Sequence, residues 1–467
     1  MCLQEKLMEY ELSLQSQTTR DKSKPPEPIY DLFFFSSKDD KELSRARRKL
    51  LLENRRSRFE VAANSVISAP HRTTDGAWRS VRHIDLRIRE EEQRHAGEEA
   101  SNIGVYTPND LSVVERMLVH LHVKDRDLIY IAEKRLADSA APDQQQAAYQ
   151  RQEIQERPFV KIGTVLDALT WTFDLISSPR PRFLRSLAAF ASDDNDIAAL
   201  LAPQTAEAIR IERPHQLFTV ADVFDRFPSV RLSFADFFQI APPNSPRYYT
   251  ISSSRRFISD IVSITLGLRK VDALPLPRCS SYLAMLKPGE FVRASFYQSS
   301  FVFPLHDHRP VMLISAGTGI APFRAFLQDL QLESDSSLHQ HRPAYFFYGC
   351  RAANVDFLYA HELKHALDSG VLDQLHVAFS DDSKEPKRYV QDALLDEREL
   401  VARHLLVDEG YVYVCGSLTM GRAVKKAISA ALLRHPEFSG GAILTKEDAD
   451  RVVTQKLAGH FIITEFW

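Results

Sequence analysis

The sequence predicts an antiparallel β unit that is interrupted by a helical insertion and followed by a doubly wound parallel sheet. Segments with strand-like alternation of apolar and polar residues lie at 58–68 and 80–88, and strand-like segments return after residue 246. The stretch between them, at about 111–240, has mostly helical periodicity. After Pro304, short apolar runs alternate with helical stretches, a rhythm typical of a parallel sheet covered on both faces.

Length and composition narrow the classes of protein. A chain of 467 residues is too long for one hydrophobic core, so two or three domains are expected. The net charge of −3 gives no general attraction to nucleic acid or to an anionic membrane, and we do not expect direct nucleic-acid binding. No apolar run has transmembrane length, and the first residues contain acids and no apolar signal core.

The cysteines are few and widely spaced. Their positions form no CxxC pair and are Cys2, Cys279, Cys350 and Cys415. This spacing predicts neither a zinc site nor a disulfide framework, so no metal site is expected. It favours an intracellular, reducing compartment, either cytoplasmic or mitochondrial.

The predicted domains are 1–57, an N-terminal extension, 58–304, the β unit with its insertion, and 305–467, the parallel-sheet domain. Within the extension, 38–58 is a candidate helix that opens with acids and closes with arginines, in agreement with the helix dipole. Its basic residues could dock an acidic or phosphate-rich partner or a larger assembly. A solvated charged face is the alternative that the residues leave open.

A glycine-containing turn follows the first strand of the parallel-sheet domain. In "VMLISAGTGIAPFRAFL" a buried strand runs into Gly317, Thr318 and Gly319, and a helix begins near Pro322. Glycines let a backbone approach a pyrophosphate, and the helix N-terminus offers unpaired N–H groups to it. The same glycines would suit a tight turn without a ligand, so both interpretations stay open.

The other strands of this domain also end in polar residues or glycine. Arg351 follows the second strand and Ser380 follows the third, while Cys415 closes the fourth just before a glycine. Ligands of open α/β sheets bind beyond the carboxyl ends of the strands, and a guanidinium and a hydroxyl suit phosphate and ribose. A thiol at a strand end can also be a small buried side chain and nothing more.

These motifs together resemble a known family. The segments that carry the resemblance are, in order, "RYYTISSS", "CSSYL", "SAGTGIAPFRAFLQDL", "YFFYGCR", "DFLYAHELK", "HVAFS", "KRYVQDAL" and "YVYVCGS". Their order and spacing resemble the reductase half of the diflavin reductases, the family of NADPH–cytochrome P450 reductase and sulfite reductase flavoprotein. The resemblance covers roughly 58–467 and implies a ferredoxin–NADP reductase-like fold, with an FAD-binding β-barrel, a helical connecting insertion and a nicotinamide domain. The family's flavodoxin-like FMN domain has no counterpart in the extension.

The resemblance assigns FAD binding to two segments. The first contains Arg247, Tyr248, Tyr249 and Thr250, and the second contains Cys279, Ser280 and Ser281. Arg247 is expected to pair with the pyrophosphate and Tyr249 to lie against the isoalloxazine ring. The second segment is expected to be a loop whose backbone N–H groups hold phosphate, although Pro277 replaces the family's glycine there. Taken alone, "RYYTISSS" would also suit an ordinary amphipathic strand.

The implied hydride-transfer group consists of Thr250, Cys415, Glu465 and Trp467. Thr250 stands where the family has serine, and its hydroxyl is expected to reach the flavin N5. Glu465 replaces the family's aspartate and would support the developing nicotinamide cation. Trp467 is expected to stack on the flavin, with simple packing at the end of the last strand as the alternative.

The implied NADP site departs from the family at Asp381, and it has one residue more between Ser380 and Lys387. Its residues are Gly317, Thr318, Gly319, Arg351, Ser380, Lys387, Tyr389 and Gln391. The family has arginine after the serine, whereas this chain has Asp381, which would repel a 2′-phosphate and suits a free ribose hydroxyl. Lys387 and Arg388 could compensate, so NADPH is expected and NADH remains possible.

The function expected from this resemblance is that of an FAD enzyme that takes hydride from NAD(P)H. It would pass single electrons to a separate protein acceptor, which could be flavodoxin-like, an iron–sulfur protein or a haem protein. The alternative is a reductase-like subunit that acts as a structural or assembly factor in a larger complex, because fold alone does not fix function.

Overall fold

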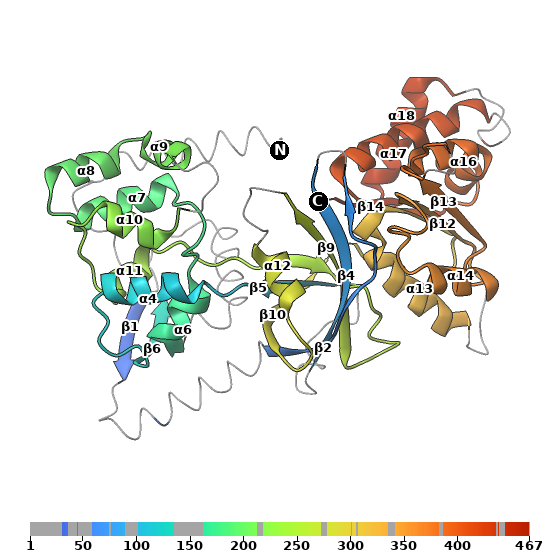
Figure 1. Ribbon diagram of the computed structural model, residues 1–467. Helices are drawn as coiled ribbons and strands as arrows, with labels where there is room; N and C mark the ends of the chain where they lie inside the picture. Colours follow the sequence, from blue (N-terminus) through green and yellow to red (C-terminus); the bar gives the residue numbers. More distant parts are fainter. Residues whose placement is uncertain are drawn as a thin grey trace. The chain divides into compact units, whose positions relative to one another are not determined.

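The computed structural model describes residues 30–35, 44, 58–73, 76–88, 101–134, 162–212, 218–271, 278–299, 301–304, 307–334, 341–382, 386–435, 438 and 444–466. They belong to two compact units, one formed by Met1–Arg56 with Thr107–Ser245 and the other by Ser57–Tyr106 with Pro246–Trp467 (Figure 1). The candidate basic helix at 38–58 falls outside the described residues except for Ser44 and Arg58, and Arg58 begins a strand. Pro277 and Trp467 also lie outside them.

The first unit is mainly helical and has its own hydrophobic core. Its helices are α4 (Leu111–His120), α6 (Val165–Asp167), α7 (Pro181–Leu187), α8 (Asp194–Leu201), α9 (Thr205–Glu212), α10 (Val220–Arg226) and α11 (Phe234–Ile240). Two of them begin at a capping box, in which the hydroxyl of Thr219 or Ser233 accepts from the backbone N–H three residues later. Phenylalanines of α10 and α11 pack with Phe173 in the centre of this core.

A small antiparallel sheet in this unit was not predicted. It has the order β1 (Tyr30–Phe35), β6 (Ile129–Lys134), β7 (Ile162–Thr164). The sequence placed β1 in an extension, but its aromatic residues pair with β6, and the Tyr30 N–H donates to Gln239 Oε1 at 3.0 Å. Aromatic residues favour strands. The partner strand lies far away in the chain, so local patterns could not reveal the pairing.

The second unit begins with an antiparallel barrel. Its strands are β2 (Arg58–Val66), β3 (His71–Arg72), β4 (Trp78–Arg87), β5 (Ser101–Tyr106), β8 (Arg247–Thr250), β9 (Ile261–Lys270) and β10 (Phe291–Gln298). They run in the order β3-β4-β2-β10-β5-β8, with β9 on β4. An isolated bridge from Ile251 to Ile264 joins the end of β8 to β9 and closes the ring.

The helical insertion leaves the barrel and returns to it between two neighbouring strands. The chain leaves after β5 and comes back just before β8, and these two strands pair directly, with Val105 opposite Arg247. Inside the helical unit, the Asn244 Nδ2 donates to the Thr107 carbonyl at 3.0 Å. The points where the chain exits and re-enters the barrel are therefore adjacent, and the insertion does not interrupt the pairing of β5 with β8.

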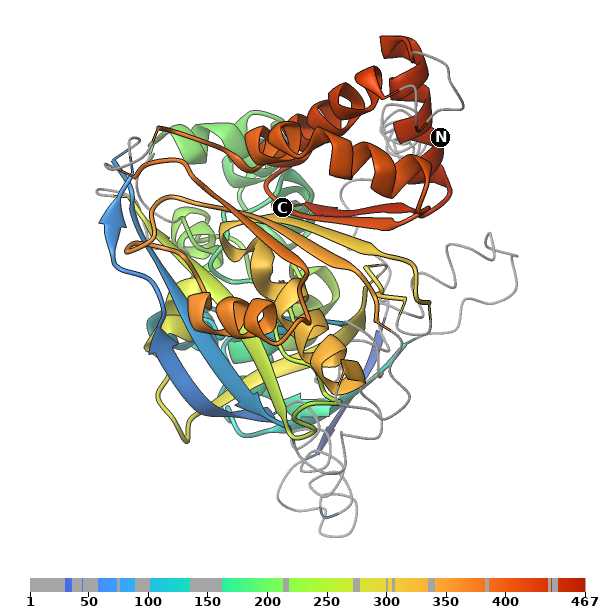
Figure 2. The same cartoon turned by 90° about the vertical axis from the view of Figure 1, so that its right-hand side faces the viewer.

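The parallel sheet confirms the predicted doubly wound domain. Its strand order is β13 (Gln374–Phe379), β12 (Ala344–Cys350), β11 (Val311–Ala316), β14 (Tyr411–Gly416), β15 (Ile462–Phe466), and every pairing is parallel. Two helices, α13 (Ala321–Ser334) and α14 (Ala360–Asp368), pack on one face. The other face is covered by α15 (Val390–Asp396), α16 (Arg398–Leu406), α17 (Leu418–Ala431) and α18 (Lys446–Ala458), and Figure 2 shows both layers.

A hydrogen-bonded cluster joins the barrel to this sheet domain. The Tyr359 hydroxyl lies 3.0 Å from His83 Nδ1 and 2.7 Å from Thr265 Oγ1, both on the barrel. Tyr359 has a left-handed backbone (φ 54°), and the guanidinium of Arg324 lies 4.9 Å from its ring centroid. These contacts fix the barrel against the carboxyl ends of the parallel strands.

No helix in the described parts of the chain is both long and apolar enough to cross a bilayer.

Because His404 is buried, we expect the free energy of unfolding to depend on pH. Burial lowers the pKa of His404 to about 4, while its Nε2 faces the Tyr411 carbonyl at 3.0 Å. Because the unfolded histidine binds its proton near pH 6.5, stability is full above that pH and is lost as the pH falls toward 4. Lowering the pH from 7.5 to 5 should cost about 2 kcal/mol more in the wild type than in His404→Gln. Denaturant unfolding at both pH values measures this, and equal losses would contradict it.

Candidate functional site

Two glycines of the turn that follows β11, Gly317 and Gly319, are required by the backbone. Gly317 has φ +56°, which favours glycine. A Cβ on Gly319 would lie 2.2 Å from the Cys415 carbonyl oxygen, so glycine lets the turn approach β14 closely. The helical turn Gly317–Ile320 continues directly into α13 at Ala321, whose N–H donates to the Thr318 carbonyl. The N–H groups at the start of this turn are therefore the ones left for a ligand.

The first FAD segment forms strand β8 at the barrel rim. Arg247 is exposed and makes no ion pair with the described residues, so its guanidinium is available to an anion. Tyr248 is 56% exposed, and its ring meets Tyr297 edge-on at 4.6 Å between centroids. Tyr249 is partly buried, and burial together with the neighbouring Cys279 thiol raises its pKa. An unpaired cation beside flat aromatic area fits a dinucleotide.

The second FAD segment is helical, where a loop was expected. Cys279, Ser280 and Ser281 lie in the first turn of α12 (Arg278–Met285), whose N–H groups have no partners within the helix. The Ser281 hydroxyl is buried and has no hydrogen-bond partner among the described residues. A buried donor without a partner is costly, so a bound phosphate would satisfy it. The segment therefore fits the predicted role with a different backbone conformation.

Thr250, Cys415 and Glu465 are brought together where the barrel meets the parallel sheet. The Thr250 Oγ1 donates to Glu465 Oε1 at 3.4 Å, and Glu465 pairs in register with Cys415. Burial raises the pKa of Glu465, although hydrogen bonds from Asn102 and Thr250 oppose the shift. Burial and the Glu465 charge raise the pKa of the fully buried Cys415. Sequence reasoning missed Asn102, because it lies on β5, outside the motifs that carry the resemblance.

The C-terminal strand is held in the sheet up to its last described residue. Phe466 pairs with Gly416 of β14. Its ring fills the space above Gly421, where a Cβ would lie 2.2 Å from a ring carbon. Lys425 also places its ammonium 5.8 Å from the Phe466 ring centroid. Trp467 would follow this anchored strand, and its stacking on a flavin stays a prediction.

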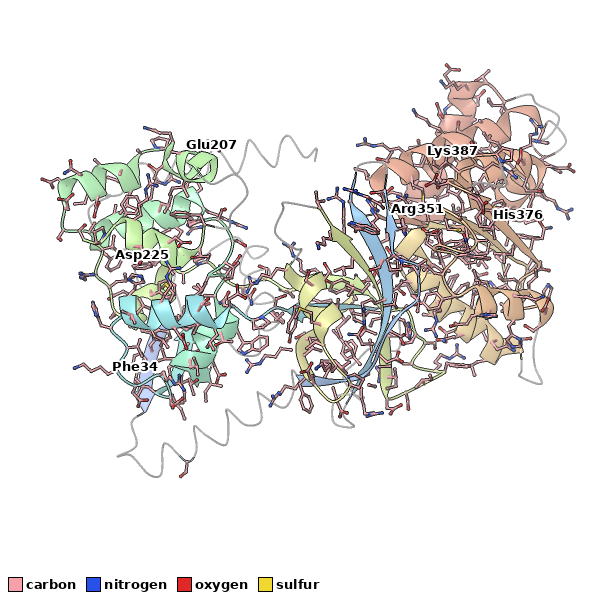
Figure 3. All side chains as sticks on the ribbon, in the orientation of Figure 1. Phe34, Glu207, Asp225, Arg351, His376 and Lys387 are labelled. Carbon is pink, nitrogen blue, oxygen red and sulfur yellow. The ribbon has the colours of Figure 1, made fainter. Side chains whose placement is uncertain are left out.

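The predicted coenzyme residues gather beyond the carboxyl ends of β12 and β13. Arg351 follows β12, and Lys387 lies just before α15 (Figure 3). The Ser380 hydroxyl donates to the Cys350 carbonyl at 3.3 Å. Lys387 lies over the Tyr389 ring, at 5.2 Å from its centroid. Gln391 lies in the first turn of α15.

Comparison with known proteins finds two matching domain families. The family described as "FAD binding domain" matches residues 59–275, and the family described as "Oxidoreductase NAD-binding domain" matches residues 313–426. NADPH–cytochrome P450 reductase of Dictyostelium discoideum is 31% identical over 368 residues, which cover 76% of this chain and 51% of that protein. The chain carries the FAD-binding and NAD-binding domains of the diflavin reductase family.

Other relatives within the diflavin reductase family are nitric oxide synthases. That of Drosophila melanogaster is 35% identical over 294 residues, which cover 60% of this chain and 22% of the synthase. Nitric oxide synthase 3 of Sus scrofa is 30% identical over 391 residues, covering 81% of this chain and 31% of the synthase. The chain therefore spans about half the length of the first relative and less than a third of these synthases.

Proposed function

We propose that the protein transfers a hydride from NAD(P)H to FAD and then passes single electrons to a separate protein acceptor. The observation that carries this proposal is the contact between Thr250 of the barrel and Glu465 of the parallel sheet, at 3.4 Å. A strand end of the FAD-binding domain and a strand end of the NAD-binding domain meet at this contact. Hydride transfer requires such an approach of two cofactor sites.

The residues present fit the chemistry that bound FAD supplies, which is to accept two electrons together and release them one at a time. Arg247 and the first turn of α12 would hold the pyrophosphate, and Tyr249 would cover the ring. The Thr250 hydroxyl orients the Glu465 carboxyl, which in its ionised form stabilises positive charge on a nicotinamide. The buried Cys415 helps to exclude water from the same place.

The acceptor is proposed by class. The relative from Dictyostelium discoideum is named for a cytochrome P450, which is a haem protein. A flavodoxin-like protein, an iron–sulfur protein or a haem protein would each accept one electron at a time. We further propose an intracellular reducing compartment, cytoplasmic or mitochondrial, because Cys279, Cys350 and Cys415 are all buried free thiols.

The purified protein is expected to be yellow. Extraction of its flavin should yield FAD, and FMN should not be the only flavin found. Under anaerobic conditions NAD(P)H should bleach it, and a one-electron protein acceptor should restore the colour. A colourless protein, or one with stoichiometric FMN alone, would contradict the proposal. Bound FAD that neither NADH nor NADPH bleaches would favour the structural or assembly role instead.

A further inference from the structure

We propose that the coenzyme site prefers a nicotinamide dinucleotide with a free 2′-hydroxyl on its adenosine ribose, as in NADH, over one with a 2′-phosphate. This inference rests on the proposed function for the identity of the site and deepens it by naming the coenzyme. It is carried by the partners of the cationic side chains around Ser380. Each such cation that the structure describes is engaged by an acid or by a tyrosine of the protein itself.

The first cation, Arg351, faces Asp381. The Arg351 Nη1 lies 3.8 Å from Asp381 Oδ2, and the Asp381 backbone N–H donates to the Arg351 carbonyl at 2.9 Å. The two residues follow neighbouring strands, so the sheet itself holds them together. The Asp381 side chain is 67% exposed, which leaves its carboxylate open to accept a hydrogen bond from a ribose hydroxyl.

The second cation, Arg388, is turned to another partner. Its guanidinium pairs with the Asp396 carboxylate at the end of α15. Its backbone N–H donates to the Phe379 carbonyl at 2.8 Å, which fixes this stretch beside β13. The sequence left open that Arg388 could offset the charge of Asp381 at a 2′-phosphate. In the structure, Arg388 pairs with Asp396 instead.

The third cation, Lys387, interacts with both Tyr389 and Asp381. A hydrogen bond with the Tyr389 hydroxyl raises the pKa of Lys387, and the carboxylate charge of Asp381 adds to the shift. Among the described residues next to Ser380, the formal charges of Arg351 and Lys387 are balanced by those of Asp381 and Asp382. A phosphate monoester brings nearly two negative charges to this neutral surface, whereas a hydroxyl brings none. Like charge next to Asp381 disfavours the phosphate.

Equilibrium binding of two nucleotide fragments tests the preference without turnover. Calorimetric titration of the purified full chain with ADP-ribose and with 2′-phospho-ADP-ribose gives the ratio of dissociation constants. ADP-ribose is expected to bind about tenfold more tightly or better. Equal binding, tighter binding of the phosphorylated fragment, or no binding of either would overturn the proposal.

Substitutions identify the residue responsible. Asp381→Arg should strengthen binding of the phosphorylated fragment by about tenfold to a hundredfold. Asp381→Asn should lose the wild-type preference. Asp368→Arg is the matched control, because this substitution makes the same change in charge at the end of α14. Asp368 pairs there with Lys364 at 3.2 Å. A change in the ratio as large in the control as in Asp381→Arg would show a general charge effect and overturn the proposal.

Flavin reduction separates this inference from the proposed function. Bleaching of bound FAD with a higher kcat/KM for NADH than for NADPH supports both. A higher kcat/KM for NADPH overturns the coenzyme preference and leaves the proposed function intact. If neither coenzyme bleaches the flavin, the proposed function fails, and the ratio of fragment binding still decides the preference.

Discussion

Arg247→Ala is expected to purify without its flavin. Arg247 is exposed at the start of β8 and makes no ion pair with the described residues, so its guanidinium is free to pair with a pyrophosphate. Removing it would leave the charge of the ligand unpaired, at a cost of about 2–4 kcal/mol. This corresponds to a loss of roughly 30-fold to 1,000-fold in FAD affinity. Equilibrium titration of the flavin-free protein with FAD measures the change.

Two further variants sharpen this result. Arg247→Lys keeps the charge without the planar fork and should fall between the wild type and the alanine variant. Lys270→Ala removes an exposed cation from the end of β9 on the same barrel, and it should leave FAD affinity unchanged. Stoichiometric flavin retained by Arg247→Ala would mean that the role of β8 has been misassigned.

Glu465→Gln is expected to slow flavin reduction on the order of 10²-fold, as for other preorganised charges removed from an active site. The carboxylate of Glu465 is poised beside Thr250 and Cys415, where the coenzyme and the flavin would meet. The amide keeps the size of the side chain and one acceptor oxygen but loses the charge. The dissociation constant of NAD(P)H should change little, so anaerobic stopped-flow reduction at saturating coenzyme isolates the effect.

The pH dependence gives the same prediction a second readout. Because burial raises the pKa of Glu465, the wild-type rate should fall as the pH drops through a value above that of an ordinary glutamic acid. The Gln variant should lack this step. A raised carboxyl pKa means that the folded state disfavours the charge, so the variant should not melt earlier at neutral pH. A lower Tm with an unchanged rate would make Glu465 a structural group. Glu447→Gln, exposed on α18, is the matched control.

Much of the fold could be predicted because its signals are local. The strands of the parallel sheet are short apolar runs, and Gly317 stands where the backbone turns with a positive φ. The three-stranded sheet of the helical unit was missed, since its strands pair over long distances in sequence. The Cys279–Ser281 segment was expected to be a loop from the family pattern, and the α-helical first turn of α12 replaces it.

The candidate site divides in the same way. The family resemblance was enough to nominate Thr250, Cys415 and Glu465, which the structure then places together. The partners of the charged residues were not predictable. Asp381 meets Arg351 because β12 and β13 are neighbours, and a motif read along the chain does not contain that adjacency.

The adjacency of β5 and β8 governs how this protein must assemble during synthesis. Val105 pairs with Arg247, on the order of 140 residues later, so a ribosome makes the whole helical unit before the barrel can close. Closing so long a loop by chance would be slow. The hydrogen bond from Asn244 to Thr107 brings the two chain ends of the helical unit together. Folding of that unit therefore brings β8 next to β5, and the barrel is completed only by β9 and β10, which follow β8 in the chain.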